Sequence, residues 1–187
     1  MHLFSPNLIG PAWGLSELGL SVFKRSKAGA ASRDRHSLPV IWGVNLTAVI
    51  LGVFLAYHAP GWRLPGWLPE QVAGGSLFVA GLILRWYAII YLGRFFTVNV
   101  AIADDHQVIQ TGPYRWVRHP SYSGGLLMIL GFCVCMGNLA SLLVIMVPCT
   151  GVLLWRMRIE EAALRAALGE PYAAYMRSTR RLIPLIY

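Results

Sequence analysis

The longest uncharged stretch of this sequence limits the folds that the chain can adopt. Residues 122–155 contain no aspartate, glutamate, lysine, arginine or histidine. A helix needs about 20 mostly apolar residues to cross a bilayer, so this stretch is too long for one crossing and barely long enough for two. Gly137-Asn138 lies near its middle and is typical of a tight turn. The stretch therefore predicts a helical hairpin with legs near 123–136 and 139–155.

Three further segments are apolar enough to form helices in a membrane. Residues 38–58 predict a spanning helix, and residues 72–93 predict a second one that holds a single charge, Arg85. We expect Arg85 to cap a helix or to extend to the membrane interface. Residues 8–23 are weaker because Pro11 and Glu17 interrupt them. We expect a short first span there, with an interfacial helix as the alternative.

The composition agrees with an all-α integral membrane protein. Of the 187 residues, 56% are hydrophobic and 13% are charged, whereas a soluble domain has about 25% charged residues. These values argue against a soluble globule, a disordered chain and a disulfide scaffold. The length predicts a single membrane domain, residues 1–187. The three cysteines lie in apolar runs, so we interpret them as small buried side chains and expect no metal site.

The basic residues predict the orientation of the chain. They gather in three segments, 24–35, 94–118 and 156–181, whereas the segment 59–71 holds only Arg63. Cytoplasmic loops of membrane proteins are enriched in lysine and arginine. Five spans with the N-terminus outside, or alternatively four with the N-terminus inside, put all three basic segments in the cytoplasm. Orientation in the bilayer then explains the net charge of +8, and we expect no nucleic-acid partner.

The first polar segment on this predicted cytoplasmic side, residues 93–121, is dense in hydrogen-bonding and aromatic side chains. Gly112-Pro113 predicts a turn, and Arg118-His119-Pro120 comes directly before the hairpin. The residues alone fit a functional site. They fit equally well a juxtamembrane loop with arginines and aromatic side chains at the lipid interface.

The second polar segment, residues 156–187, begins with a helix over 156–168 that continues the last span. Arg156 and Glu160 share one face of this helix, and Arg158 and Glu161 form a pair on another face. Two interpretations are open. In the first, both pairs are surface ion pairs. In the second, a carboxylate holds Arg156 at the lipid boundary, where it binds an anionic substrate group.

Glycine and proline predict how this second segment continues. Gly169 is a plausible helix C-cap. A short helix restarts at Glu170-Pro171 and is expected to end at Ile183-Pro184.

Two blocks of sequence resemble the signature of the isoprenylcysteine carboxyl methyltransferase family. The first block is HQVIQTGPYRWVRHPSYSG at residues 106–124. The second is RxxxEE at 156–161, followed by LGEPY at 168–172 and RLIP at 181–184. The resemblance covers about residues 94–187, which we take as the catalytic half. The N-terminal half resembles the family only as a set of spans.

The resemblance implies a multi-pass membrane methyltransferase whose cytosolic loop and C-terminal helices form a pocket for S-adenosyl-L-methionine. It implies that Arg156 and Glu160 are catalytic, with Arg156 at the substrate carboxylate. Asn99 stands where the eukaryotic enzymes have glutamine, which puts that contact in doubt. The cofactor contacts implied by position are Asn99, His106, Gln107, Val108, Ile109, Tyr114, His119, Pro120, Ser121, Tyr122 and Glu160.

The reaction implied is methyl transfer to a lipophilic acceptor, in the first place the carboxylate of a prenylcysteine-like or other lipid-like substrate. A carboxylate is already ionised at neutral pH, so the site needs alignment and exclusion of water rather than a strong base. A phospholipid amine or a thiol stays open as acceptor. The alternatives of another class are an NADPH-dependent membrane reductase of the sterol-reductase type and a non-catalytic membrane protein with the same fold.

Overall fold

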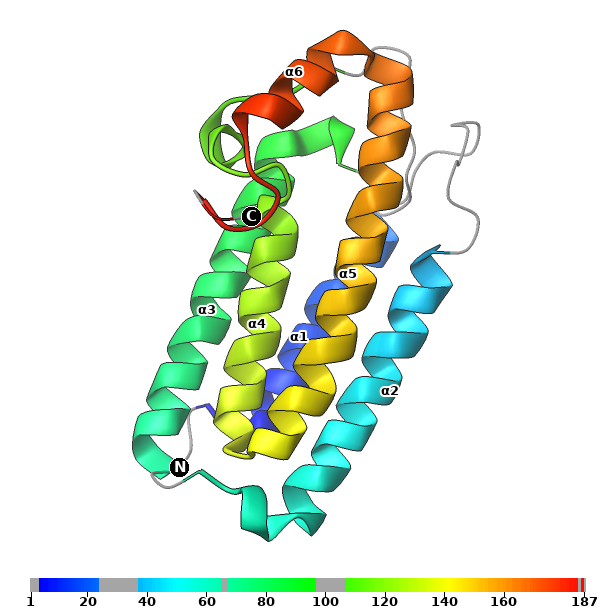
Figure 1. Ribbon diagram of the computed structural model, residues 1–187. Helices are drawn as coiled ribbons and strands as arrows, with labels where there is room; N and C mark the ends of the chain where they lie inside the picture. Colours follow the sequence, from blue (N-terminus) through cyan, green and yellow to red (C-terminus); the bar gives the residue numbers. More distant parts are fainter. Residues whose placement is uncertain (1–3, 24–36, 65–66, 97–106, 185, 187) are drawn as a thin grey trace.

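The computed structural model describes residues 4–23, 37–64, 67–96, 107–184 and 186. These described residues form α-helices and short 3-10 turns and contain no β-strand, which confirms the all-α prediction. In Figure 1 the long helices run side by side, and a short helix near the C-terminus lies across one end. The helices are α1 Pro6–Phe23, α2 Ser37–His58, α3 Trp67–Leu92, α4 Pro120–Met136, α5 Leu139–Leu168 and α6 Glu170–Ser178.

The hairpin predicted from the uncharged stretch is confirmed as α4 and α5. Gly137 ends α4 in the left-handed conformation, with φ at 58°. Asn138 then caps α5, because its side-chain oxygen accepts a hydrogen bond of 3.0 Å from the backbone N–H of Ser141. α5 continues without a break to Leu168, as predicted. Its 30 residues correspond to about 45 Å, which exceeds the hydrocarbon thickness of a bilayer.

Three helical segments of the described chain are long and apolar enough to cross a membrane: Ser37–His58, Pro69–Phe95 and Leu139–Leu168. α4 is apolar but shorter, and α1 is not among the three candidates. The choice between five and four crossings therefore stays a prediction.

α3 and α4 pack with their backbones in close contact because glycines face each other along the seam. A Cβ atom on Gly131 of α4 would lie 2.5 Å from the Gly74 oxygen and from the Phe78 nitrogen of α3. A Cβ on Gly81 would lie 2.6 Å from the Gly124 oxygen. Small residues that allow close helix approach are the usual means of packing helices in membranes.

The apolar core lies between this helix pair and the pair α2–α5. Ile129, Phe132 and Cys133 of α4 pack there against Ile145 and Cys149 of α5, and all five are buried. The three cysteines are free and buried, as expected. These apolar contacts hold the two helix pairs together.

The C-terminal tail closes that end of the bundle (Figure 1). The predicted restart at Glu170-Pro171 is confirmed, but α6 ends at Ser178 rather than at Ile183-Pro184. The chain leaves the helix because its backbone pairs with the segment before α4. The backbone N–H of Arg118 donates to the Arg180 carbonyl at 2.7 Å, and that of His119 donates to the Arg181 carbonyl at 3.0 Å.

Candidate active site

A cavity of about 640 Å³ lies inside this end of the bundle. Its wall is formed by side chains of all six helices and of the segment before α4. Of the residues proposed from the sequence, those in the wall are Gln107, Val108, Ile109, Tyr114, His119, Ser121, Tyr122, Arg156 and Glu160. Pro120 is not in the wall; it is buried as the first residue of α4. Asn99 and His106 lie outside the described residues.

Arg156 and Glu160 lie together at one side of this cavity, as their spacing on α5 predicts. The Arg156 side chain is 2% exposed, donates a hydrogen bond to Ser37 Oγ of α2, and interacts electrostatically with Glu160. The Tyr122 hydroxyl donates to Glu160 Oε2 at 2.8 Å. His119 stacks on Tyr122 with ring centroids 5.4 Å apart. Arg156 is therefore not a surface ion-pair residue. Ser37 contacts its guanidinium in the cavity wall, and Tyr122 contacts the Glu160 carboxylate.

Glu161 does not form the surface pair with Arg158 that the helical spacing suggested. Its carboxylate is 3% exposed and contacts two arginines and one histidine of other segments, while Arg158 is exposed. Arg118 Nε lies 2.9 Å from Oε1, His119 Nε2 lies 3.2 Å from Oε1, and Arg181 Nη2 lies 2.8 Å from Oε2. One buried carboxylate thus ties the loop before α4 and the C-terminal tail to α5.

Two tyrosines of α6, Tyr172 and Tyr175, also line the cavity. Tyr172 belongs to the LGEPY block, but neither tyrosine was predicted to be a site residue. The Tyr175 hydroxyl donates to the Tyr114 carbonyl at 2.6 Å. Burial raises the pKa of Tyr175 to about 12, so the phenol keeps its proton at neutral pH and continues to donate. Their spacing of three residues on a short helix was the available signal, since it puts both rings on one face.

Arg85 does not cap a helix; its side chain makes polar contacts inside the bundle. Its Nη2 lies 2.7 Å from Glu17 Oε2 of α1, and its Nη1 donates to the Ser121 carbonyl at 3.1 Å. The two side chains are only 13% and 21% exposed. Opposite charges at this depth compensate each other's loss of water. Glu17, which interrupts the apolar run of α1, is thus the ion-pair partner of Arg85 in α3.

The cavity has an apolar side between α1 and α2. Trp13 and Leu20 of α1 and Ile41 of α2 line it, together with Trp42 and Leu46. Trp42 is 43% exposed and Leu46 62% exposed, so this wall reaches the outer surface of the bundle. At the other side the exposed Gln107 lines the cavity. The cavity therefore joins a lipid-facing surface to a polar one.

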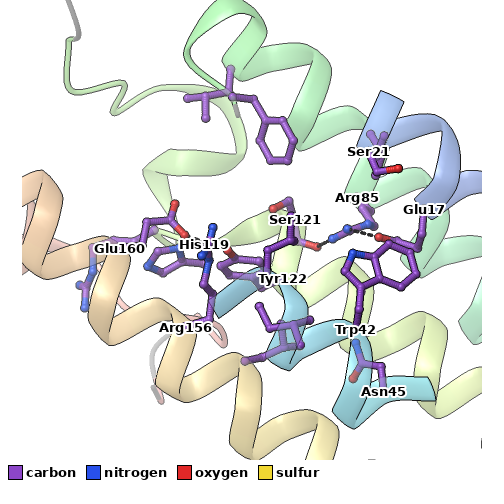
Figure 2. A pocket seen from close by; sticks show the side chains of 18 of the residues that line it. Glu17, Ser21, Trp42, Asn45, Arg85, His119, Ser121, Tyr122, Arg156 and Glu160 are labelled. Carbon is purple, nitrogen blue, oxygen red and sulfur yellow. Dashed lines mark hydrogen bonds and ion pairs between the residues drawn. The ribbon is translucent and has the colours of Figure 1, made fainter. Parts of the chain in front are cut away.

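The two sides are visible in the close view of the cavity. Figure 2 shows Arg156, Glu160 and His119 on one side of the view and the dashed contacts of Arg85 on the other. Ser121 and Tyr122 lie between them. Such an arrangement can hold an anionic group beside Arg156 while an apolar chain extends toward α1 and α2.

Comparison with known proteins gives consistent matches. The "Isoprenylcysteine carboxyl methyltransferase (ICMT) family" profile matches residues 74–166. Protein-S-isoprenylcysteine O-methyltransferase B of Arabidopsis thaliana is 30% identical over 129 residues, which are 68% of this chain and 64% of that protein. The protein-S-isoprenylcysteine O-methyltransferase of Schizosaccharomyces pombe is 34% identical over 118 residues, 62% of this chain and 50% of that protein. The chain thus spans about half to two thirds of these relatives.

A solved structure has the same fold. It is described as the eukaryotic intramembrane Ras methyltransferase ICMT without a monobody, and it superimposes with a TM-score of 0.65 at 26% sequence identity. The match covers 81% of this chain and 54% of that one. It supports an integral membrane protein. Through residues 74–166, the chain belongs to the isoprenylcysteine carboxyl methyltransferase family.

Proposed function

We propose that this protein transfers a methyl group from S-adenosyl-L-methionine to the carboxylate of a lipid-like acceptor, either a prenylcysteine-like substrate or another lipid acid. The observation that carries the proposal is the buried Arg156 beside Glu160 in a cavity that is polar on one side and apolar on the other. The names of the relatives, protein-S-isoprenylcysteine O-methyltransferases, support the same reaction class.

The residues around the polar side fit the proposed cofactor. A cavity of about 640 Å³ lies within the usual range for small-molecule sites, roughly 300–1,000 Å³. The Glu160 carboxylate suits a positively charged sulfonium, and the Tyr122 and His119 rings offer faces to a cation or a base. Gln107, Val108 and Ile109 also line the cavity, and Gln107 is exposed. S-adenosylmethionine would supply an activated methyl group at this place.

The protein's own contribution is alignment and charge. The Arg156 guanidinium would hold the acceptor carboxylate by charge-assisted hydrogen bonds. Glu160, fixed by the Tyr122 hydroxyl at 2.8 Å, would brace Arg156 or face the cofactor's positive charge. The acceptor is already ionised at neutral pH, so none of these residues has to remove a proton. The apolar side between α1 and α2 would exclude water and receive the acceptor's chain from the bilayer.

Binding of S-adenosylhomocysteine and of NADPH to the detergent-purified protein, measured separately by calorimetry, tests the cofactor class. We expect saturable binding of S-adenosylhomocysteine and none of NADPH. NADPH binding alone would contradict the proposal and favour a reductase.

A substitution separates the two roles left open for Glu160. If its carboxylate faces the sulfonium, Glu160→Gln weakens binding of S-adenosylmethionine about tenfold, but weakens binding of S-adenosylhomocysteine, whose sulfur is neutral, much less. If it only braces Arg156, both cofactors bind as before and acceptor turnover falls. The matched control is Glu70→Gln in the first turn of α3, outside this cavity. It should change neither cofactor binding nor acceptor turnover.

A further inference from the structure

The membrane side of the cavity holds charged groups that the proposed methyl transfer does not use. Glu17 Oε2 and Arg85 Nη2 lie 2.7 Å apart, and both residues line the cavity. Within the described residues the second oxygen of Glu17 has no hydrogen bond. Ionisable residues at membrane depth that face a cavity usually belong to a functional site. A purely hydrocarbon ligand would have no use for this pair.

The same region holds buried polar atoms without partners. Among the described residues, three buried side-chain atoms make no hydrogen bond: Asn45 Oδ1, Gln71 Oε1 and Arg85 Nε. Asn45 and Arg85 line this cavity, whereas Gln71 does not. Buried polar groups are nearly always bonded, and an unmade bond in an apolar environment is costly. The cavity therefore presents an unused acceptor and an unused donor on its apolar side.

Two of these groups, Glu17 and Asn45, come from a different part of the chain than Arg156 and Glu160, whereas Arg85 lies within the family match. Glu17 belongs to α1 and Asn45 to α2, and both precede the family match, which begins at residue 74. In Figure 2 Asn45, Trp42 and Glu17 lie on the side away from Arg156 and Glu160. The cavity thus has polar groups at two places, with Ser121 and Tyr122 between them.

We propose that Asn45 and the Glu17–Arg85 pair form a second polar subsite, which selects an acceptor whose apolar chain carries a hydrogen-bond donor such as a hydroxyl or an amide N–H. The assignment rests on the proposed function, because it takes the acceptor's carboxylate to lie beside Arg156. A donor on the chain would satisfy Asn45 Oδ1 or the second oxygen of Glu17. An unsubstituted chain would leave both unbonded, and sites built for a hydrogen bond discriminate strongly against ligands that lack it.

The test uses fatty acids of one chain length as probes. Binding of a series of monohydroxy acids, with the hydroxyl moved along the chain, is compared calorimetrically with binding of the unsubstituted acid to the detergent-purified protein. We expect one hydroxyl position to bind about fivefold more tightly than the unsubstituted acid. Asn45→Leu should remove that preference and leave binding of the unsubstituted acid. Thr47→Val, on α2 outside this cavity, is the matched control and should keep the preference.

The outcomes separate this assignment from the proposed function. Equal affinity for every acid in the wild-type protein would overturn the subsite, and so would a preference that persists in Asn45→Leu. Binding of S-adenosylhomocysteine is measured on the same samples and tests the proposed methyl transfer independently. A hydroxyl preference without S-adenosylhomocysteine binding would keep the subsite and remove the reaction assigned to it.

Discussion

Arg156 and Arg158 lie on the same helix but differ in their surroundings. Arg156 is buried in the cavity wall, and Arg158 is exposed. If Arg156 orients the acceptor carboxylate, Arg156→Ala should lower kcat/KM toward a prenylcysteine acceptor by roughly 100-fold or more. Arg156→Lys should recover only part of this, because a lysine cannot make the forked contact. Methyl-transfer kinetics with Arg158→Ala as the control check the assignment; equal losses in both would contradict it.

Glu161 is expected to matter for stability in a way that Glu170 does not. Glu161→Gln keeps the shape of the side chain but leaves Arg118, 8% exposed, without its counter-charge. Removing one partner of a buried ion pair costs about 3–5 kcal/mol, so the free energy of unfolding in detergent should fall by about that amount. Glu170→Gln breaks the exposed contact with Arg177 and should change little. Similar denaturation midpoints for both variants would contradict this account.

At this scale the sequence predicts some partners and not others. The helical period brings Arg156 and Glu160 together because they are neighbours on one turn. It cannot bring Glu161 to Arg118 or Glu17 to Arg85, because those contacts join segments far apart in the chain. The residues of the cavity wall that follow the family signature could be proposed in advance. Those contributed by α1 and α2 could not, since their role depends on how the helices pack. Tyr172 of α6 lies in the LGEPY block, but its place in the cavity wall follows only from the packing of α6.

At the scale of helices, the seam between α3 and α4 makes a sharp prediction. A Cβ on Gly131 would lie 2.5 Å from backbone atoms of α3, and a backbone cannot move aside as a flexible side chain can. Gly131→Ala should therefore destabilise the protein by about 1–3 kcal/mol. Gly151→Ala on α5 has nothing within 4 Å and should be neutral or slightly stabilising. Thermal unfolding of both variants in one detergent checks this, and equal stability would exclude tight packing at the seam.

Helix length and helix ends differ in how well the sequence determines them. Apolar length and the Gly137-Asn138 turn predict α2, α4 and α5, because hydrophobic stretches and turn residues act locally. The end of α6 at Ser178 was predicted five residues too late. Its position is set by the pairing of Arg180 and Arg181 with the segment before α4, a contact that no local pattern reveals. For α1, the interrupting Glu17 reflects its ion pair with Arg85.

For the whole molecule, the distribution of arginines predicts which end of the bundle faces the cytoplasm. Among the described residues, the end that carries the short connection between α2 and α3 has Arg63, and the opposite end, near α6, is strongly basic (Figure 1). Basic segments are retained on the cytoplasmic side. The polar side of the cavity should therefore open to the cytoplasm, where a water-soluble cofactor would reach it, while its apolar side meets the bilayer.

Cysteine labelling in cells tests this orientation. The three native cysteines are buried, so a membrane-impermeant maleimide should report on introduced ones. Gly61→Cys, at the exposed turn after α2, and Ala174→Cys, on the exposed face of α6, mark the two ends. Gly61→Cys should react in intact cells, and Ala174→Cys should react only after the membrane is permeabilised. The reverse pattern would place the polar side of the cavity outside the cell, where an intracellular cofactor could not reach it, and would contradict both the orientation and the proposed supply of the methyl donor.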